Sequence, residues 1–70
     1  MKNVTLMSGY RHPSYDLFVV VNTETNIALE GSSNTRNAER AASILNQHEV
    51  ANGRGSVYQV FPAADLNFIK

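Results

Sequence analysis

A segment near the N-terminus, residues 10–16, holds the side chains most able to do chemistry. It places a serine, a histidine and an aspartate within five positions, namely Ser14, His12 and Asp16. A catalytic triad, however, is assembled from separate rigid elements, and neighbours on one loop rarely reach its geometry. The sequence also has no cysteine nucleophile and no Gly-x-Ser-x-Gly turn. We therefore expect no catalytic residues and a protein that is not an enzyme.

The same segment is better suited to contact with another molecule. Tyr10, Arg11, His12 and Tyr15 combine large contact areas with directed polar groups, and tyrosine and arginine are enriched at binding hot spots. Pro13 restricts the backbone between them, which lowers the cost of ordering the loop on binding. We predict that these four residues contact a partner. The alternative is that the two tyrosines only close the ends of the core.

A second candidate site lies in a segment with helical periodicity. Arg36 and Arg40 are four residues apart, so they lie one turn apart on a helix. Two guanidinium groups at that spacing can clamp a phosphate or a partner carboxylate, although they can equally form a solvated surface. Together with Arg54, and with Tyr58 for stacking, they give a second hypothesis, weak nucleic-acid binding. Six basic and six acidic residues cancel, so the chain lacks the basic excess typical of nucleic-acid binders, and this partner is less favoured.

The sequence gives little indication of a metal site, a cofactor site or a membrane segment. The chain has no cysteine, and His12 and His48 have no third such ligand to complete a zinc tetrahedron. Residues 53–55 are too short for a phosphate-binding loop. The longest apolar stretch, residues 17–21, cannot cross a bilayer, and the N-terminal residues lack the apolar run of a signal peptide. We expect no metal, no cofactor and a cytoplasmic protein.

These residues must be positioned by a single domain, residues 1–70. Segments 4–7, 15–22, 27–30 and 56–61 are β-prone, and the polar residues 22–26 make segments 15–22 and 27–30 a hairpin. Segment 17–21 is apolar at every position, which is typical of a strand that is covered on both faces.

The helix is predicted from the spacing of its apolar residues. Ala38, Ala41, Ala42 and Leu45 fall on one face, with Asn34 or Thr35 as the N-cap and a stop at Asn52-Gly53. The expected fold is α+β: a small antiparallel sheet of three to four strands with one helix packed on one face, in the order strand, strand, strand, helix, strand.

The tail, residues 63–70, contains Leu66, Phe68 and Ile69 and is too apolar to be left in water. It packs either on its own domain or on a second copy. A chain of this length buries only about 60% of its unfolded surface. Segments 4–7, 27–30 and 57–61 also carry no inward lysine or internal proline to discourage edge pairing. We therefore predict a homodimer.

Residues 18–25, 30–31, 34–42, 45–46 and 57–60 form one connected pattern. Over residues 17–61 it resembles the strand–turn–strand–helix–strand layout of small accessory proteins encoded by tailed bacteriophages. This resemblance implies a non-enzymatic protein that binds a host protein and modulates or inhibits it. Residues 30–33 and 37–41 are also similar to the first strand and helix of the peptidoglycan-binding SPOR domain, but that domain repeats the unit, whereas this chain has one convincing helix.

Overall fold

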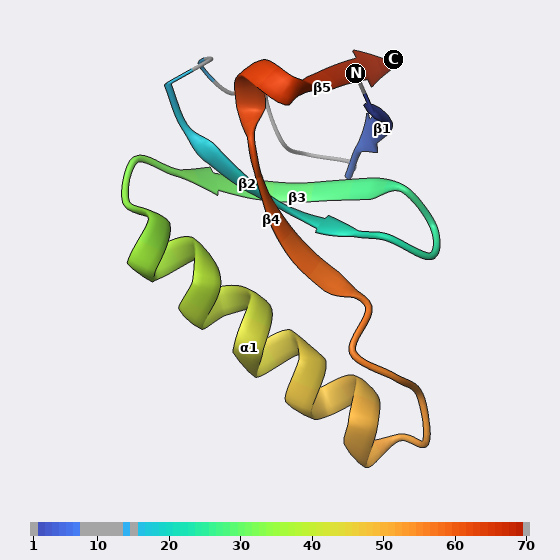
Figure 1. Ribbon diagram of the computed structural model, residues 1–70. Coiled ribbons are helices and arrows are strands. Elements are labelled where there is room, and N and C mark those ends of the chain that lie inside the picture. The colour runs from blue at the N-terminus through green and yellow to red at the C-terminus, as the bar shows by residue number, and fades with distance from the viewer. Residues whose placement is uncertain (1, 8–13, 15, 70) are drawn as a thin grey trace.

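The chain forms five strands, one α-helix and one 3₁₀ turn over the residues that the computed structural model describes, 2–7, 14 and 16–69 (Figure 1). In chain order these are β1 (Lys2–Leu6), β2 (Phe18–Asn22), β3 (Ile27–Ser32), α1 (Thr35–Ala51), β4 (Tyr58–Pro62), η1 (Ala63–Asp65) and β5 (Leu66–Ile69).

The sheet has the strand order β4-β2-β3-β1-β5 and is mixed. β2 pairs antiparallel with β3 and β4, whereas β1 pairs parallel with β3 and with β5. The predicted α+β class is confirmed, but the predicted all-antiparallel sheet of three to four strands is wrong. The N-terminal strand joins the hairpin at β3 in a parallel sense, and the tail adds a further strand. A tight turn cannot join parallel neighbours, and along the chain β3 follows β1 only after β2, which pairs antiparallel with β3.

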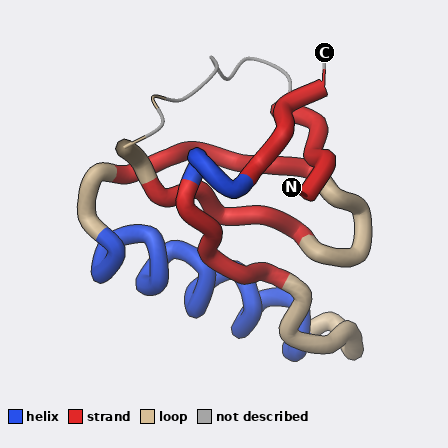
Figure 2. Tube along the Cα trace, turned by 45° about the horizontal axis from the view of Figure 1, so that its top comes forward, coloured by secondary structure: helices blue, strands red, loops and turns tan. Residues whose placement is uncertain are grey.

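The sheet is curled and carries the helix on one face (Figure 2). One cluster of buried side chains lies inside the curl, and a second lies between the sheet and the helix. Lys2 on β1 and Phe61 on β4 illustrate the curl, because the Lys2 ammonium lies 5.9 Å from the centre of the Phe61 ring although two strands separate β1 from β4 in the sheet. The inner cluster consists of Val4, Val19, Val21, Ala28, Ala63 and Leu66. The helix-side cluster consists of Val20, Ala38 and Ala42, with Phe18, Leu29, Ala41, Leu45, Tyr58 and Val60 packed against it.

The apolar tail belongs to this domain. It turns through η1 and forms β5, which lies beside β1 with Lys2 opposite Leu66 and Val4 opposite Phe68. Leu66 is only 2% exposed and is among the largest fully buried side chains. Of the two predicted placements of the tail, the structure shows packing on its own domain. β1 and β3 are interior strands, so the predicted edge pairing through segments 4–7 and 27–30 is wrong.

The helix follows the sequence prediction closely. Asn34 is the N-cap, and its side chain accepts a hydrogen bond of 2.8 Å from the backbone N–H of Arg36. At the other end Gly53 adopts a φ of +82°, which lets its N–H reach the carbonyl of Val50 at 3.0 Å, while the N–H of Arg54 reaches that of Glu49 at 2.7 Å. These paired bonds form a Schellman motif, which explains why the helix ends at this glycine.

A candidate binding groove between α1 and β4

The four residues of the predicted contact loop, Tyr10, Arg11, His12 and Tyr15, lie outside the described residues. Their predicted role in partner binding stays a prediction. It can be tested by changing Tyr10 and Arg11 to alanine. Loss of partner binding with an unchanged melting temperature would assign these side chains to an interface, whereas a large loss of stability would assign them to the core.

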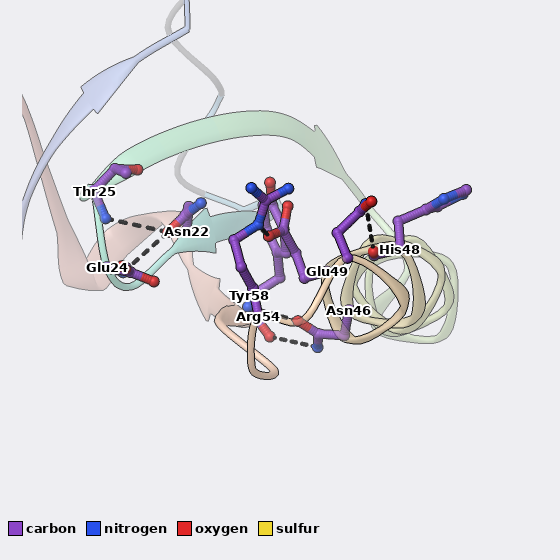
Figure 3. A network of polar contacts seen from close by, with 9 residues as sticks. Asn22, Glu24, Thr25, Asn46, His48, Glu49, Arg54 and Tyr58 are labelled. Carbon is purple, nitrogen blue, oxygen red and sulfur yellow. Dashed lines mark hydrogen bonds and ion pairs between the residues drawn. The ribbon is translucent and has the colours of Figure 1, made fainter.

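The predicted arginines do not gather at one place. Arg36 and Arg40 are exposed in the N-terminal half of α1, whereas Arg54 lies beyond its C-terminal end, and 17 helical residues span about 25 Å. Arg54 also forms an ion pair with Glu49, whose side chain is only 17% exposed (Figure 3). Tyr58 packs against the helix-side cluster. The structure therefore does not bring these residues together as one surface for a nucleic acid.

A groove runs between α1 and β4, with a volume of about 820 Å³. β4 is an edge strand, so one side of the groove follows the outer edge of the sheet. Its lining is mostly small, neutral or apolar: Ala42, Ser43, Asn46, Gln47, Val50 and Ala51 from the helix, with Glu39, and Ser56, Tyr58, Gln59 and Val60 from β4 and the residues before it. Val50 is 56% exposed, so an apolar side chain lies open to solvent within this surface.

Asn46 bridges the helix and the strand edge in this groove. Its side-chain Nδ2 donates to the carbonyl of Tyr58 at 3.0 Å, and its Oδ1 accepts from the N–H of Tyr58 at 2.8 Å (Figure 3). One amide thus satisfies both backbone groups that a neighbouring strand would otherwise use. Edge strands expose such groups and pair readily with other chains, so Asn46 closes β4 at Tyr58.

The next backbone groups along the same edge are those of Val60. The N–H of Thr23 bonds to the carbonyl of Val57 at 2.9 Å, and that of Ala63 to the carbonyl of Leu17 at 2.8 Å. In an antiparallel pair, hydrogen-bonded and non-hydrogen-bonded residue pairs alternate. The backbone N–H and C=O groups of odd-numbered β4 residues therefore point toward β2, and those of even-numbered residues point away from the sheet. Among the described residues, nothing pairs with the outward N–H and C=O of Val60.

At the far end of β4 the edge offers no hydrogen-bond donor. Pro62 also stands at an outward-facing position, where its missing N–H disturbs no bond within the sheet. The outer edge of β4 therefore offers one residue with both a donor and an acceptor, Val60, between Tyr58 and Pro62. This arrangement restricts what can pair with the strand to a short extended segment.

Sequence reasoning missed Asn46 as a site residue, although a signal was present. Ala38, Ala42 and Asn46 are spaced by four, so Asn46 continues the buried face of the helix. A polar side chain on such a face requires a hydrogen-bond partner. The pattern could thus have indicated a side-chain contact, but not with which backbone.

The described residues contain no group of three or more histidine, cysteine, aspartate or glutamate side chains that could hold a metal ion. Nor does any helix in the described ranges have the length and hydropathy needed to cross a membrane.

No protein-family model matches the chain, and neither the curated proteins nor the solved structures give a match. The resemblance to phage accessory proteins accordingly rests on the residue pattern alone.

Proposed function

We propose that this chain is a non-enzymatic binding module that holds a segment of another protein in the α1–β4 groove. The observation that carries the proposal is the pair of backbone groups on Val60, which face outward from an edge strand and have no partner among the described residues. Edge strands of this kind bind extended segments by adding a strand, with main-chain hydrogen bonds for affinity and side-chain pockets for specificity.

The lining of the groove supports recognition rather than chemistry. Glu39 is the one side chain charged at neutral pH among the described residues that line it. General acid–base catalysis needs a titratable group within hydrogen-bond reach of the reacting atoms, and usually a second group that orients it. Ser43 and Ser56 have no histidine beside them in the lining. An apolar floor with neutral hydrogen-bonding groups suits a peptide backbone and its side chains.

The partner is proposed to be a protein whose activity the binding changes. On the residue pattern shared with phage accessory proteins, that partner is a host protein. Nucleic-acid binding remains the alternative, but the structure separates the arginines on which that hypothesis depended.

A library of randomised seven-residue peptides, selected on the immobilised chain, tests the proposal. Selected peptides, titrated into ¹⁵N-labelled protein, should shift the backbone amide signals of Ser43, Asn46 and Val60. Shifts confined to the outer helix surface around Arg36 and Arg40, or no selection at all, would contradict the proposal. A single-stranded oligonucleotide serves as the comparison probe, because binding through phosphates weakens steeply as salt rises.

The groove can also be blocked directly. Ser43 is exposed and lines the groove, so Ser43→Trp should fill it and abolish peptide binding. Asn37 is also exposed on the same helix but is not among the residues that line the groove, which makes Asn37→Trp the matched control. If both variants bind the selected peptides as the unaltered chain does, the groove is not the site.

A further inference from the structure

The geometry of the strand edge points to a specific kind of ligand. We infer that the groove takes an extended peptide segment that pairs with β4 at Val60 and places a lysine or arginine side chain beside Glu39. This inference rests on the proposed function and adds to it the backbone conformation and the charge of the bound segment.

Hydrogen bonding sets the conformation and the length. Val60 presents an N–H and a C=O in one direction, which a residue in extended geometry matches with its own C=O and N–H. The Asn46 amide occupies the Tyr58 groups, and Pro62 has no N–H to offer. The segment therefore makes one such pair of bonds with β4, at Val60, while Pro62 can add only its carbonyl as an acceptor.

The helix explains why the edge is open at Val60 and closed at Tyr58. Asn46 reaches Tyr58, whereas the residue one turn earlier on the same face is Ala42, which belongs to the cluster that Val60 packs against. The methyl group of Ala42 can neither donate nor accept a hydrogen bond. Ala42, Ser43 and Val60 consequently line an open part of the groove where a second asparagine would have closed it.

Charge complementarity sets the side chain. Glu39 is one turn of helix before Ser43, and hence at the Val60 part of the groove. The described residues form no ion pair with Glu39, because the one salt bridge among them joins Arg54 and Glu49. A cation on the ligand would meet a carboxylate that has no ion-pair partner among the described residues, although Arg36 lies three residues before it on the same helix.

A second copy of the chain fits this edge poorly. A two-fold axis at Val60 would pair the two Val60 residues and place Pro62 of one copy opposite Tyr58 of the other. Neither position can then add a hydrogen bond, since Tyr58 is closed by Asn46 and Pro62 lacks an N–H. The Glu39 carboxylates of the two copies would also lie on the same interface, where like charges repel. A peptide from another protein satisfies the same edge without these conflicts.

The charge is tested with selected peptides from the seven-residue library. They should be enriched in lysine or arginine, and replacing that residue by glutamine should weaken binding roughly two- to fivefold, as expected for an exposed ion pair. In Glu39→Gln the same replacement should have no further effect, which shows that the two groups interact. Glu24→Gln, an identical change in the exposed turn between β2 and β3, is the control. Enrichment of acidic residues, or an unchanged preference in Glu39→Gln, would overturn the inference.

The backbone pairing is tested by chemical synthesis of the 70-residue chain with N-methylvaline at Val60. This change removes the outward N–H and keeps the side chain, so circular dichroism should be unaltered while peptide affinity falls at least fivefold. Sarcosine at Gly55, an exposed position in the connection before β4, is the matched control.

The outcomes separate the two proposals. If Ser43→Trp abolishes binding and N-methylation of Val60 does not, the groove binds peptides without strand pairing, and only the inference fails. If neither change affects binding, the proposed function fails as well. The mass of the chain without peptide is the third readout. If it is twice that of one chain, and N-methylation of Val60 returns it to that of one chain, a second copy occupies the groove and the inference is overturned.

Discussion

The Asn46 bridge should contribute a measurable part of the stability of this domain. Asn46→Ala removes the two hydrogen bonds, of 3.0 and 2.8 Å, that join α1 to the edge of β4. A typical intramolecular hydrogen bond contributes about 0.5–1.5 kcal/mol to stability, so the two together contribute about 1–3 kcal/mol. The lower half of this range is expected, because Tyr58 is partly accessible and water can replace the lost partner.

Alanine also favours the helix over asparagine, by up to about 0.7 kcal/mol, and this gain must be removed from the comparison. Asn37→Ala makes the identical change at an exposed position of α1 whose side chain has no hydrogen bond among the described residues. The difference between the two variants therefore isolates the bridge. We expect Asn46→Ala to be less stable than Asn37→Ala by about 1–2 kcal/mol.

Urea unfolding followed by circular dichroism measures this difference. With a slope of about 1 kcal/mol/M for a chain of this size, the midpoint of Asn46→Ala should lie about 1–2 M below that of Asn37→Ala. Equal midpoints at equal slopes would show that the bridge contributes nothing and refute the role assigned to Asn46. A changed slope would instead indicate an altered unfolded or native state.

Three further predictions concern the core, the tail and self-association. Ala42→Glu buries a carboxylate without a partner and should unfold the domain. Arg40→Glu, on the exposed side of the helix, should change the free energy of unfolding by no more than about 0.5 kcal/mol. Equal melting temperatures of the two variants would contradict this prediction. Truncation after Ala64 removes Leu66 from the inner cluster and should cost at least about 2 kcal/mol, so a truncated chain with full stability would refute the place of β5 in the core. The homodimer predicted from the sequence should have a mass of twice 7.7 kDa by light scattering at micromolar concentration. Ile69→Lys should weaken it, because Ile69 is 46% exposed on β5, the second edge strand. A mass near 7.7 kDa for the unaltered chain would exclude the dimer.

Local patterns in the sequence predicted the helix and strand β2 well. The spacing of Ala38, Ala42 and Leu45 identified the face that packs on the sheet, and Asn52-Gly53 identified its end. The continuous apolar run of β2 correctly indicated burial on both faces, since Val19 and Val20 belong to opposite clusters. The helix face, the helix end and the burial of β2 depend on residues that are close together in the sequence, so they can be predicted from the sequence alone.

The arrangement of strands could not be predicted in the same way. Nothing local to Lys2–Leu6 or Leu66–Ile69 indicates that these strands, at opposite ends of the chain, pair with each other in parallel. The groove depends on the same long-range arrangement, because it forms only where β4 becomes an edge next to α1. Its hydrogen-bonding pattern follows from the register of β4 with β2, which a single strand does not reveal.

Amide hydrogen exchange at Tyr58 and Val60 tests the central claim most directly. In the unbound protein the Tyr58 N–H is held by Asn46 and should exchange slowly, whereas the outward N–H of Val60 should exchange at a rate close to that of an unprotected amide. Addition of a selected peptide should slow exchange at Val60 and leave Tyr58 unchanged. A Val60 amide that is already protected in the unbound protein, or that stays unprotected with the peptide bound, would contradict the account.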